Sequence, residues 1–209
     1  MASKRALSIL QILDNMYPET KCYLEYETPW QLLIATILSA QCTDERVNKV
    51  TKELFKKYPT VLDFANADYE ELMSDIRETG FYRNKAKNII ECMKVIHYEY
   101  SDEVPSDIDK LTALAGVGRK TANVIRGNIY NIPSIVVDTH VKRVSNRLGL
   151  TDREDPVKIE FELMKHLPQN HWISFNTQVI AFGRQICKAQ SPKCQECPLV
   201  SFCRFPKTK

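Results

Sequence analysis

The chain has 209 residues, of which 44% are hydrophobic and 26% are charged, and its formal net charge is +3. This composition is ordinary for a globular protein of one or two small domains. No apolar run approaches the ~20 residues that a membrane helix requires, which excludes a membrane-spanning protein. The basic N-terminal stretch has no small-residue cleavage site, so we expect a helix there rather than a signal peptide, and a cytoplasmic location.

The positive charge is concentrated in two stretches. Residues 116–150 carry a net charge of +5 and residues 188–209 a net charge of +4, so the rest of the chain sums to −6. Two basic stretches on an acidic body indicate a polyanionic partner bound on one side. Two solvated helix faces would explain the charge pattern equally well.

Apolar residues recur at helical spacing through almost the whole chain, which predicts an all-α fold. Ser3 is expected to cap a first helix whose buried face contains Ala6, Leu7, Leu10 and Leu13. The next helix begins at Thr28-Pro29 and continues to residue 41, and because it is apolar nearly all round it should lie at the centre of the fold. Further helices are predicted from Thr43 or Asp44, from Asp68, and over 82–100, 107–114, 119–130, 139–148, 156–166 and 172–187.

A helix-hairpin-helix pattern surrounds Gly116-Val117-Gly118. Apolar spacing ends at Leu114, two glycines allow positive φ and a close backbone approach, and a new helix starts at once. The amides at the start of that helix can face a DNA phosphate without reading any base. Gly-x-Gly also occurs in helical turns generally, but the flanking apolar spacing and the basic Arg119-Lys120 favour DNA binding.

Lys120 lies in the first turn of the helix that follows the hairpin. The helix N-terminus and burial both disfavour an ammonium there, and a neutral amine can attack a sugar carbon and form a Schiff base. From the local sequence alone, a lysine that merely contacts phosphate is the better interpretation. Asp138 follows an apolar run and is either a helix N-cap or a carboxylate that assists the lysine and stabilises positive charge on deoxyribose.

Four of the seven cysteines lie close together near the C-terminus, with the spacing Cys187-x6-Cys194-x2-Cys197-x5-Cys203. The odd number of cysteines and the lack of a secretion signal argue against a disulfide framework. Structural zinc usually takes two close pairs separated by a longer loop, whereas only one close pair occurs here. A cluster held by four thiolates is therefore the better match, with zinc as the alternative.

Three segments carry a resemblance to a known family: LSAQCTD at 38–44, LAGVGRKTANV at 114–124 and VDTHVKRVSNRLGL at 137–150. Together with the cysteine spacing they resemble the endonuclease III family of helix-hairpin-helix DNA glycosylases, over essentially the whole chain. The resemblance implies a [4Fe–4S] cluster. It also implies two helical subdomains with a DNA-binding cleft between them. One would be a helical barrel at 22–132 that contains the hairpin at about 108–130, and the other would comprise 1–21 plus 133–209 with the cluster loop at 187–203.

The resemblance also implies roles for individual residues. Lys120 would be the nucleophile and Asp138 the essential carboxylate, while Gln41 would fill the gap left by an extruded base and Phe81 would be the tip of a wedge. Further DNA contacts are expected from Gly116, Val117, Gly118, Arg119, Arg143 and Lys193. Phe81 stands where many members have leucine, and Ala115 stands where the family often has proline, so the wedge and the hairpin depart from the usual pattern.

The implied function is base-excision repair by a monomer that binds damaged double-stranded DNA. The enzyme would remove oxidised pyrimidines and cleave the strand by β-elimination through a lysine Schiff base. Three alternatives compete with this interpretation. An adenine-mismatch glycosylase shares the cluster but lacks a lysine at the position of Lys120. A DNA-binding protein that is not an enzyme would need neither Lys120 nor Asp138. An electron carrier would not need a DNA hairpin.

Overall fold

The computed structural model describes residues 3–19 and 21–205. Helices and connecting loops make up these residues, and no strand occurs among them, which confirms the predicted all-α class. None of the helices in these two ranges has the length and apolar character needed to cross a membrane. The chain divides into two compact units. Unit 1 comprises Met1–Lys21 and Asn131–Lys209, and unit 2 comprises Cys22–Tyr130. The sequence analysis placed the C-terminal boundary of the barrel domain at residue 132.

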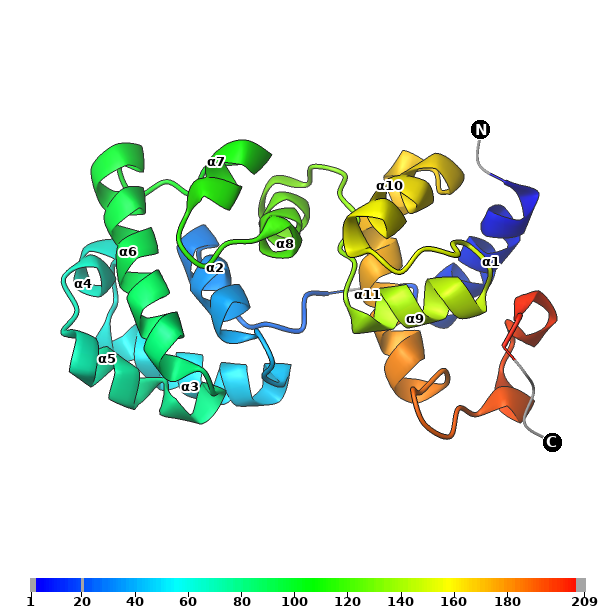
Figure 1. The fold of residues 1–209 in the computed structure, drawn as a ribbon, viewed down its shortest axis with the longest axis horizontal. Helices are drawn as coiled ribbons and strands as arrows, with labels where there is room; N and C mark the ends of the chain where they lie inside the picture. Colours follow the sequence, from blue (N-terminus) through cyan, green and yellow to red (C-terminus); the bar gives the residue numbers. More distant parts are fainter. Residues whose placement is uncertain (1–2, 20, 206–209) are drawn as a thin grey trace. The chain divides into compact units, whose positions relative to one another are not determined.

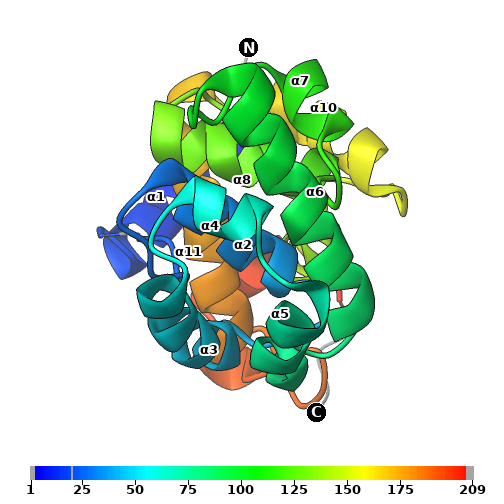
Figure 2. The ribbon, with the colours of Figure 1, turned by 90° about the vertical axis from the view of Figure 1, so that its left-hand side faces the viewer.

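Unit 2 is built around one buried helix. It contains α2 (Pro29–Leu38), α3 (Asp44–Lys57), α4 (Val61–Ala65), α5 (Tyr69–Asp75), the 3₁₀ turn η1 (Arg77–Thr79), α6 (Tyr82–Tyr100), α7 (Ile108–Ala113) and α8 (Arg119–Tyr130) (Figure 1). Every residue of α2 after Pro29 is buried, and α2 packs against α3, α6 and α8. In Figure 2, α2 lies in the middle of the other helices of unit 2. The prediction of a central helix is confirmed.

The ends of these helices follow from local hydrogen bonds. Thr28 and Gln31 form a reciprocal capping box at the start of α2, with Pro29 in the first position. The helix ends at Leu38, three residues earlier than predicted, because tight turns replace its hydrogen-bonding pattern and Gln41 takes a left-handed backbone conformation. Thr43 caps α3, which decides between the two candidates for that cap. The single turn of α4 was not predicted, since five residues are too few to show a period.

Unit 1 contains α1 (Lys4–Met16), α9 (Thr139–Arg147), α10 (Pro156–His166), η2 (Gln169–His171), α11 (Trp172–Gln185), η3 (Cys194–Glu196) and η4 (Val200–Phe202). Ser3 caps α1 as predicted, accepting a hydrogen bond from the Ala6 amide. The prediction that Leu7 is buried was wrong, because its side chain is 47% exposed while Ile9 is buried. Ala6, Ile9, Leu10 and Leu13 form one stripe, and Leu7 lies about 100° away from Ala6 around the helix.

Candidate functional site

The hairpin between α7 and α8 depends on one glycine more than on the other. Gly116 has a φ of 75°, and a Cβ there would lie 2.9 Å from Cβ of Asn88. Gly118 does not adopt positive φ, which corrects the expectation for this position. None of the described residues would lie within 4 Å of a Cβ on Gly118. Gly116 is therefore required by the turn itself, whereas Gly118 leaves open space at the start of α8, where the helix dipole favours an anion.

Alanine at these two glycines is expected to have separable effects. We expect Gly116→Ala to lower the free energy of unfolding by about 1–3 kcal/mol, because the methyl group adds backbone strain and a contact with Asn88. Gly118→Ala should cost less than about 1 kcal/mol of stability. It should still weaken DNA binding several-fold, because its methyl group occupies the open space. Urea unfolding and DNA titration of both variants check this. A Gly118→Ala protein that binds DNA as tightly as the wild type would contradict the assignment of this surface.

Lys120 is the second residue of α8, so its predicted position in the first helical turn is confirmed. The expectation of burial is not met, because the Lys120 side chain is exposed. In this structure the side chain is therefore accessible to a substrate. Arg119 beside it is half-buried, as is the neighbouring Ala115 of the hairpin.

Asp138, which belongs to unit 1, is the N-cap of α9. Its Oδ1 accepts a hydrogen bond of 2.7 Å from the Val141 amide. Residues 134–136, shortly before it, are buried and lie outside any helix, and no strand occurs among the described residues to pair with them. Asn176 of α11 replaces such a strand: its Oδ1 accepts from the Val136 amide at 2.9 Å and its Nδ2 donates to the Ser134 carbonyl at 3.2 Å. Sequence reasoning missed Asn176, since a single amide in a helix carries no local signal of this role.

Gln41 and Phe81 share two properties that fit a role in contacting DNA. Both have left-handed backbone conformations, with φ values of 54° and 50°. Such conformations cost about 1–3 kcal/mol each for residues other than glycine and occur often at functional sites. Both side chains are exposed, and Phe81 is 61% exposed, which is unfavourable for a large apolar ring in water. Gly80, with φ 69° and ψ 159°, lies directly before Phe81 and supplies the backbone geometry of this turn.

The four clustered cysteines line one cavity in unit 1. Phe182, Ile186 and Leu148 also line it, so its surroundings are largely apolar. All four thiols are free of disulfides. Burial raises the pKa of the Cys197 thiol, and repulsion from the other three sulfurs raises it further, so all four lie near one another.

Within the described ranges, no three Cys, His, Asp or Glu side chains gather closely enough for a single metal ion. Four thiols that line one largely apolar cavity are the donor set of an iron–sulfur cluster. Arg147 supports this set, since its Nη1 donates to Cys187 Sγ at 3.3 Å. The same guanidinium donates to the carbonyls of Lys188 and Ala189, which orders the start of the loop.

Arg143, predicted to contact DNA, has its guanidinium engaged inside unit 1. Its Nε donates to the Cys187 carbonyl at 3.1 Å, and its Nη2 donates to the carbonyls of Gly183 and Cys187 and contacts His140. These contacts join α9 to the end of α11, so Arg143 has a structural role. Its expected contact with a DNA phosphate stays a prediction. Lys193 is exposed and pairs with Glu196 at 3.6 Å, which leaves its predicted role open.

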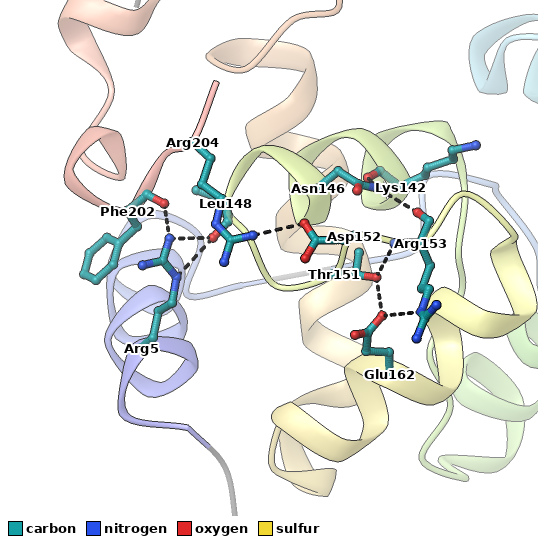
Figure 3. A network of polar contacts seen from close by, with 10 residues as sticks. All are labelled: Arg5, Lys142, Asn146, Leu148, Thr151, Asp152, Arg153, Glu162, Phe202 and Arg204. Atoms are coloured by element: carbon teal, nitrogen blue, oxygen red, sulfur yellow. Dashed lines mark hydrogen bonds and ion pairs between the residues drawn. The ribbon is translucent and has the colours of Figure 1, made fainter. Parts of the chain in front are cut away.

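A network of polar contacts holds the chain beyond the cluster loop against the end of α9 (Figure 3). Arg5 of α1 donates to the Leu148 carbonyl at 2.9 Å and also to the Phe202 carbonyl. Arg204 pairs with Asp152 at 3.0 Å. These contacts connect α1, α9 and the C-terminal segment, which lie far apart in sequence. Together with the contacts of Arg147, they anchor the loop 187–203 at both ends.

Two family models match the chain: the HhH-GPD superfamily base excision DNA repair protein over residues 34–169, and the iron-sulfur binding domain of endonuclease III over residues 187–203. Endonuclease III of Synechocystis sp. is 52% identical over 206 residues, which cover 97% of this chain and 94% of the relative. The chain belongs to the endonuclease III family. As a member of this family it is a base-excision repair DNA glycosylase and AP lyase that carries a [4Fe–4S] cluster. The predictions of a base-excision repair glycosylase and AP lyase and of a [4Fe–4S] cluster are thus confirmed.

Solved structures of endonuclease III support the same assignment. A non-covalent endonuclease III–DNA complex superimposes with a TM-score of 0.92 at 47% sequence identity, covering 98% of this chain and 96% of that chain. A trapped endonuclease III–DNA covalent intermediate, described as an estranged-adenine complex, gives the same TM-score and identity and covers 98% of this chain and 97% of that chain. Two solved relatives with this fold are therefore bound to DNA.

Proposed function

We propose that the protein excises oxidised or ring-saturated pyrimidines from duplex DNA and cleaves the resulting abasic site, with Lys120 as the nucleophile. The observation that carries this proposal is an exposed lysine in the first turn of α8, directly after an anion-binding hairpin. A phosphate held at the hairpin would bring the deoxyribose of the same strand close to the lysine. The covalent intermediate trapped with a relative is consistent with an amine nucleophile.

The proposed reaction proceeds through an imine. The neutral Lys120 amine attacks C1′ while the glycosidic bond breaks, and the base leaves with the bonding electrons and takes up a proton. The sugar ring opens to an iminium, which acidifies the proton on C2′. Loss of that proton forms a carbon–carbon double bond and breaks the C3′–O bond, so the strand is cut on the 3′ side. Water then hydrolyses the imine and regenerates Lys120.

Asp138 is proposed to stabilise the positive charge that develops on the sugar and to assist Lys120 in proton transfer. Asp138 is held in place because it also caps α9. The two roles that sequence analysis offered for this residue are therefore compatible.

Asparagine at Asp138 separates these two roles. Asparagine and aspartate are equivalent N-caps, so we expect Asp138→Asn to change the free energy of unfolding by less than about 0.5 kcal/mol. Because the charge is lost, the single-turnover excision rate should fall by about 10²–10⁴-fold. Asp138→Ala, which also removes the cap, should in addition lose about 1 kcal/mol of stability. Excision by Asp138→Asn at the wild-type rate would show that the residue is only a cap.

The remaining site residues are proposed to bind DNA and the cluster. Phe81 and Gln41 enter the duplex and support the extruded base, at an unstacking cost of about a few kcal/mol that is lowest for a damaged base. The backbone of Gly116 to Arg119 and the Lys193 side chain contact phosphates. The cluster ligands are Cys187, Cys194, Cys197 and Cys203. When bound, the cluster holds loop 187–203 in shape and takes no part in bond breaking.

The protein is further proposed to act as a monomer on chromosomal DNA in the cytoplasm. The whole proposal is tested by borohydride trapping. The protein is incubated with a duplex that contains thymine glycol or an abasic site, and borohydride then reduces any imine to a stable adduct. We expect an adduct with both damaged duplexes and none with the undamaged duplex. The proposal would be overturned if no adduct formed with thymine glycol, with the abasic site or with any other oxidised pyrimidine.

A further inference from the structure

Lys85 is a buried cation that joins two loops of unit 2. It lies near the start of α6 and its side chain is only 4% exposed. Its Nζ donates to the Leu38 carbonyl and to the Thr79 carbonyl, both at 2.8 Å. Leu38 is the last residue of α2 and Thr79 is the last residue of η1. One ammonium group therefore connects two chain segments that end side by side.

The segments that follow these two carbonyls carry the residues assigned to the duplex interior. Gln41 lies three residues after Leu38, and Phe81 lies two residues after Thr79. Both have positive φ, so their side-chain directions depend on turns that L-residues rarely adopt. A small displacement at the start of either turn would change where its side chain points. The two hydrogen bonds of Lys85 lie at the start of these turns, where they oppose such a displacement.

The position of Lys85 is unfavourable for a cation, which makes its contacts informative. Burial lowers the pKa of the Lys85 ammonium. The N-terminus of α6 carries partial positive charge, which also disfavours an ammonium in its first turns. Two carbonyls at helix ends, which lack a donor from the next helical turn, offset these costs. An apolar side chain in the same space would avoid the cost of a buried charge but would leave both carbonyls without this donor.

We propose that Lys85 is a positioning residue that holds the Gln41 and Phe81 turns at a fixed separation, so that both side chains enter the duplex together. This inference rests on the proposed function, because it takes the insertion of these two side chains as the step that extrudes the base. Lys85 itself does not contact the substrate. Its removal should therefore impair extrusion from a duplex and leave the chemistry at an already accessible sugar intact.

The first test uses Lys85→Met, which preserves the length of the side chain and removes the ammonium. Lys87→Met is the matched control, since Lys87 is an exposed lysine on the same helix. Single-turnover excision of thymine glycol from a duplex should fall by about 10–100-fold in Lys85→Met and stay at the wild-type rate in Lys87→Met. Strand cleavage at an abasic site in single-stranded DNA needs no invasion of a duplex and should change less than about twofold.

The second test asks whether Lys85 acts through Phe81. The Phe81→Ala variant and the double variant Lys85→Met/Phe81→Ala are measured on the same duplex. If the two residues serve one step, the excision rate of the double variant should lie within about twofold of the rate of the slower single variant. Multiplied losses in the double variant would overturn the proposal. Equal losses of Lys85→Met on duplex and single-stranded substrates, or wild-type excision by that variant, would also overturn it.

Two further measurements keep the outcome decisive. If Lys85→Met does not fold, as judged by circular dichroism, Lys85→Gln, which keeps one donor group, replaces it in the same comparisons. Borohydride trapping of the wild-type protein on a duplex abasic site is run in parallel. Absence of that adduct overturns the proposed function, whereas a normal adduct together with an unaffected Lys85 variant overturns only the role of Lys85.

Discussion

Replacing Lys120 by glutamine is expected to abolish the borohydride-trapped adduct on abasic DNA. The glutamine amide has no nucleophilic amine and cannot form an imine, so covalent catalysis is lost altogether. We expect the rates of base excision and strand cleavage to fall by at least about 10³-fold, as is usual when a nucleophile is removed. Binding to the same duplex should change little, because Lys120 is exposed and its loss removes one cation from a basic surface.

A matched variant tests whether the loss is specific to this position. Lys94 is an exposed lysine of α6 in the same unit, and Lys94→Gln should form the adduct at the wild-type rate. Gel analysis of the trapped complex and quench-flow measurement of strand cleavage report both steps. An adduct that persists in Lys120→Gln would identify another amine as the nucleophile. It would then favour the simpler interpretation of Lys120 as a phosphate contact.

Replacing Cys197 by serine is expected to remove the iron–sulfur cluster and to destabilise unit 1. Cys197 packs against the core of that unit, and the other three clustered cysteines line the same cavity. Loss of one thiolate ligand should eliminate the visible absorbance of the cluster and the bound iron. Because metal binding contributes directly to folding, we expect a loss of at least several kcal/mol in the stability of the loop and its surroundings.

The same variant should weaken DNA binding by about tenfold or more, because the loop that carries Lys193 is then no longer held in shape. Cys22→Ser is the control, since Cys22 belongs to unit 2 and does not line the cavity of the four clustered cysteines. It should retain the visible spectrum, the melting temperature and the affinity for DNA. Removal of the cluster by a chelator provides a second route to the same comparison. Unchanged DNA affinity after complete loss of iron would contradict the role of the loop in binding.

Helix positions, the hairpin and the cysteine set could be predicted from the sequence because their signals are local. Ser3, Thr28 and Asp138 cap helices within three residues of themselves, and apolar spacing marks the helix faces. The spacing of the four cysteines also favoured a cluster over zinc. These features depend on bonds and periods that span a few residues, so the chain order alone reveals them.

The destinations of long polar side chains were decided only by the tertiary structure. Arg143 appears in the sequence as part of a basic stretch, but its guanidinium is bound to carbonyls some 40 residues away in the chain. Lys85 appears to be one more lysine of an amphipathic helix, yet it is buried against carbonyls from two other segments. Asn176 likewise supports residues about 40 positions earlier. Hydrogen-bonding partners such as Leu38 for Lys85, or Val136 for Asn176, lie 40 or more residues away in the chain. Only folding brings them near, and charge or spacing along the chain does not encode them.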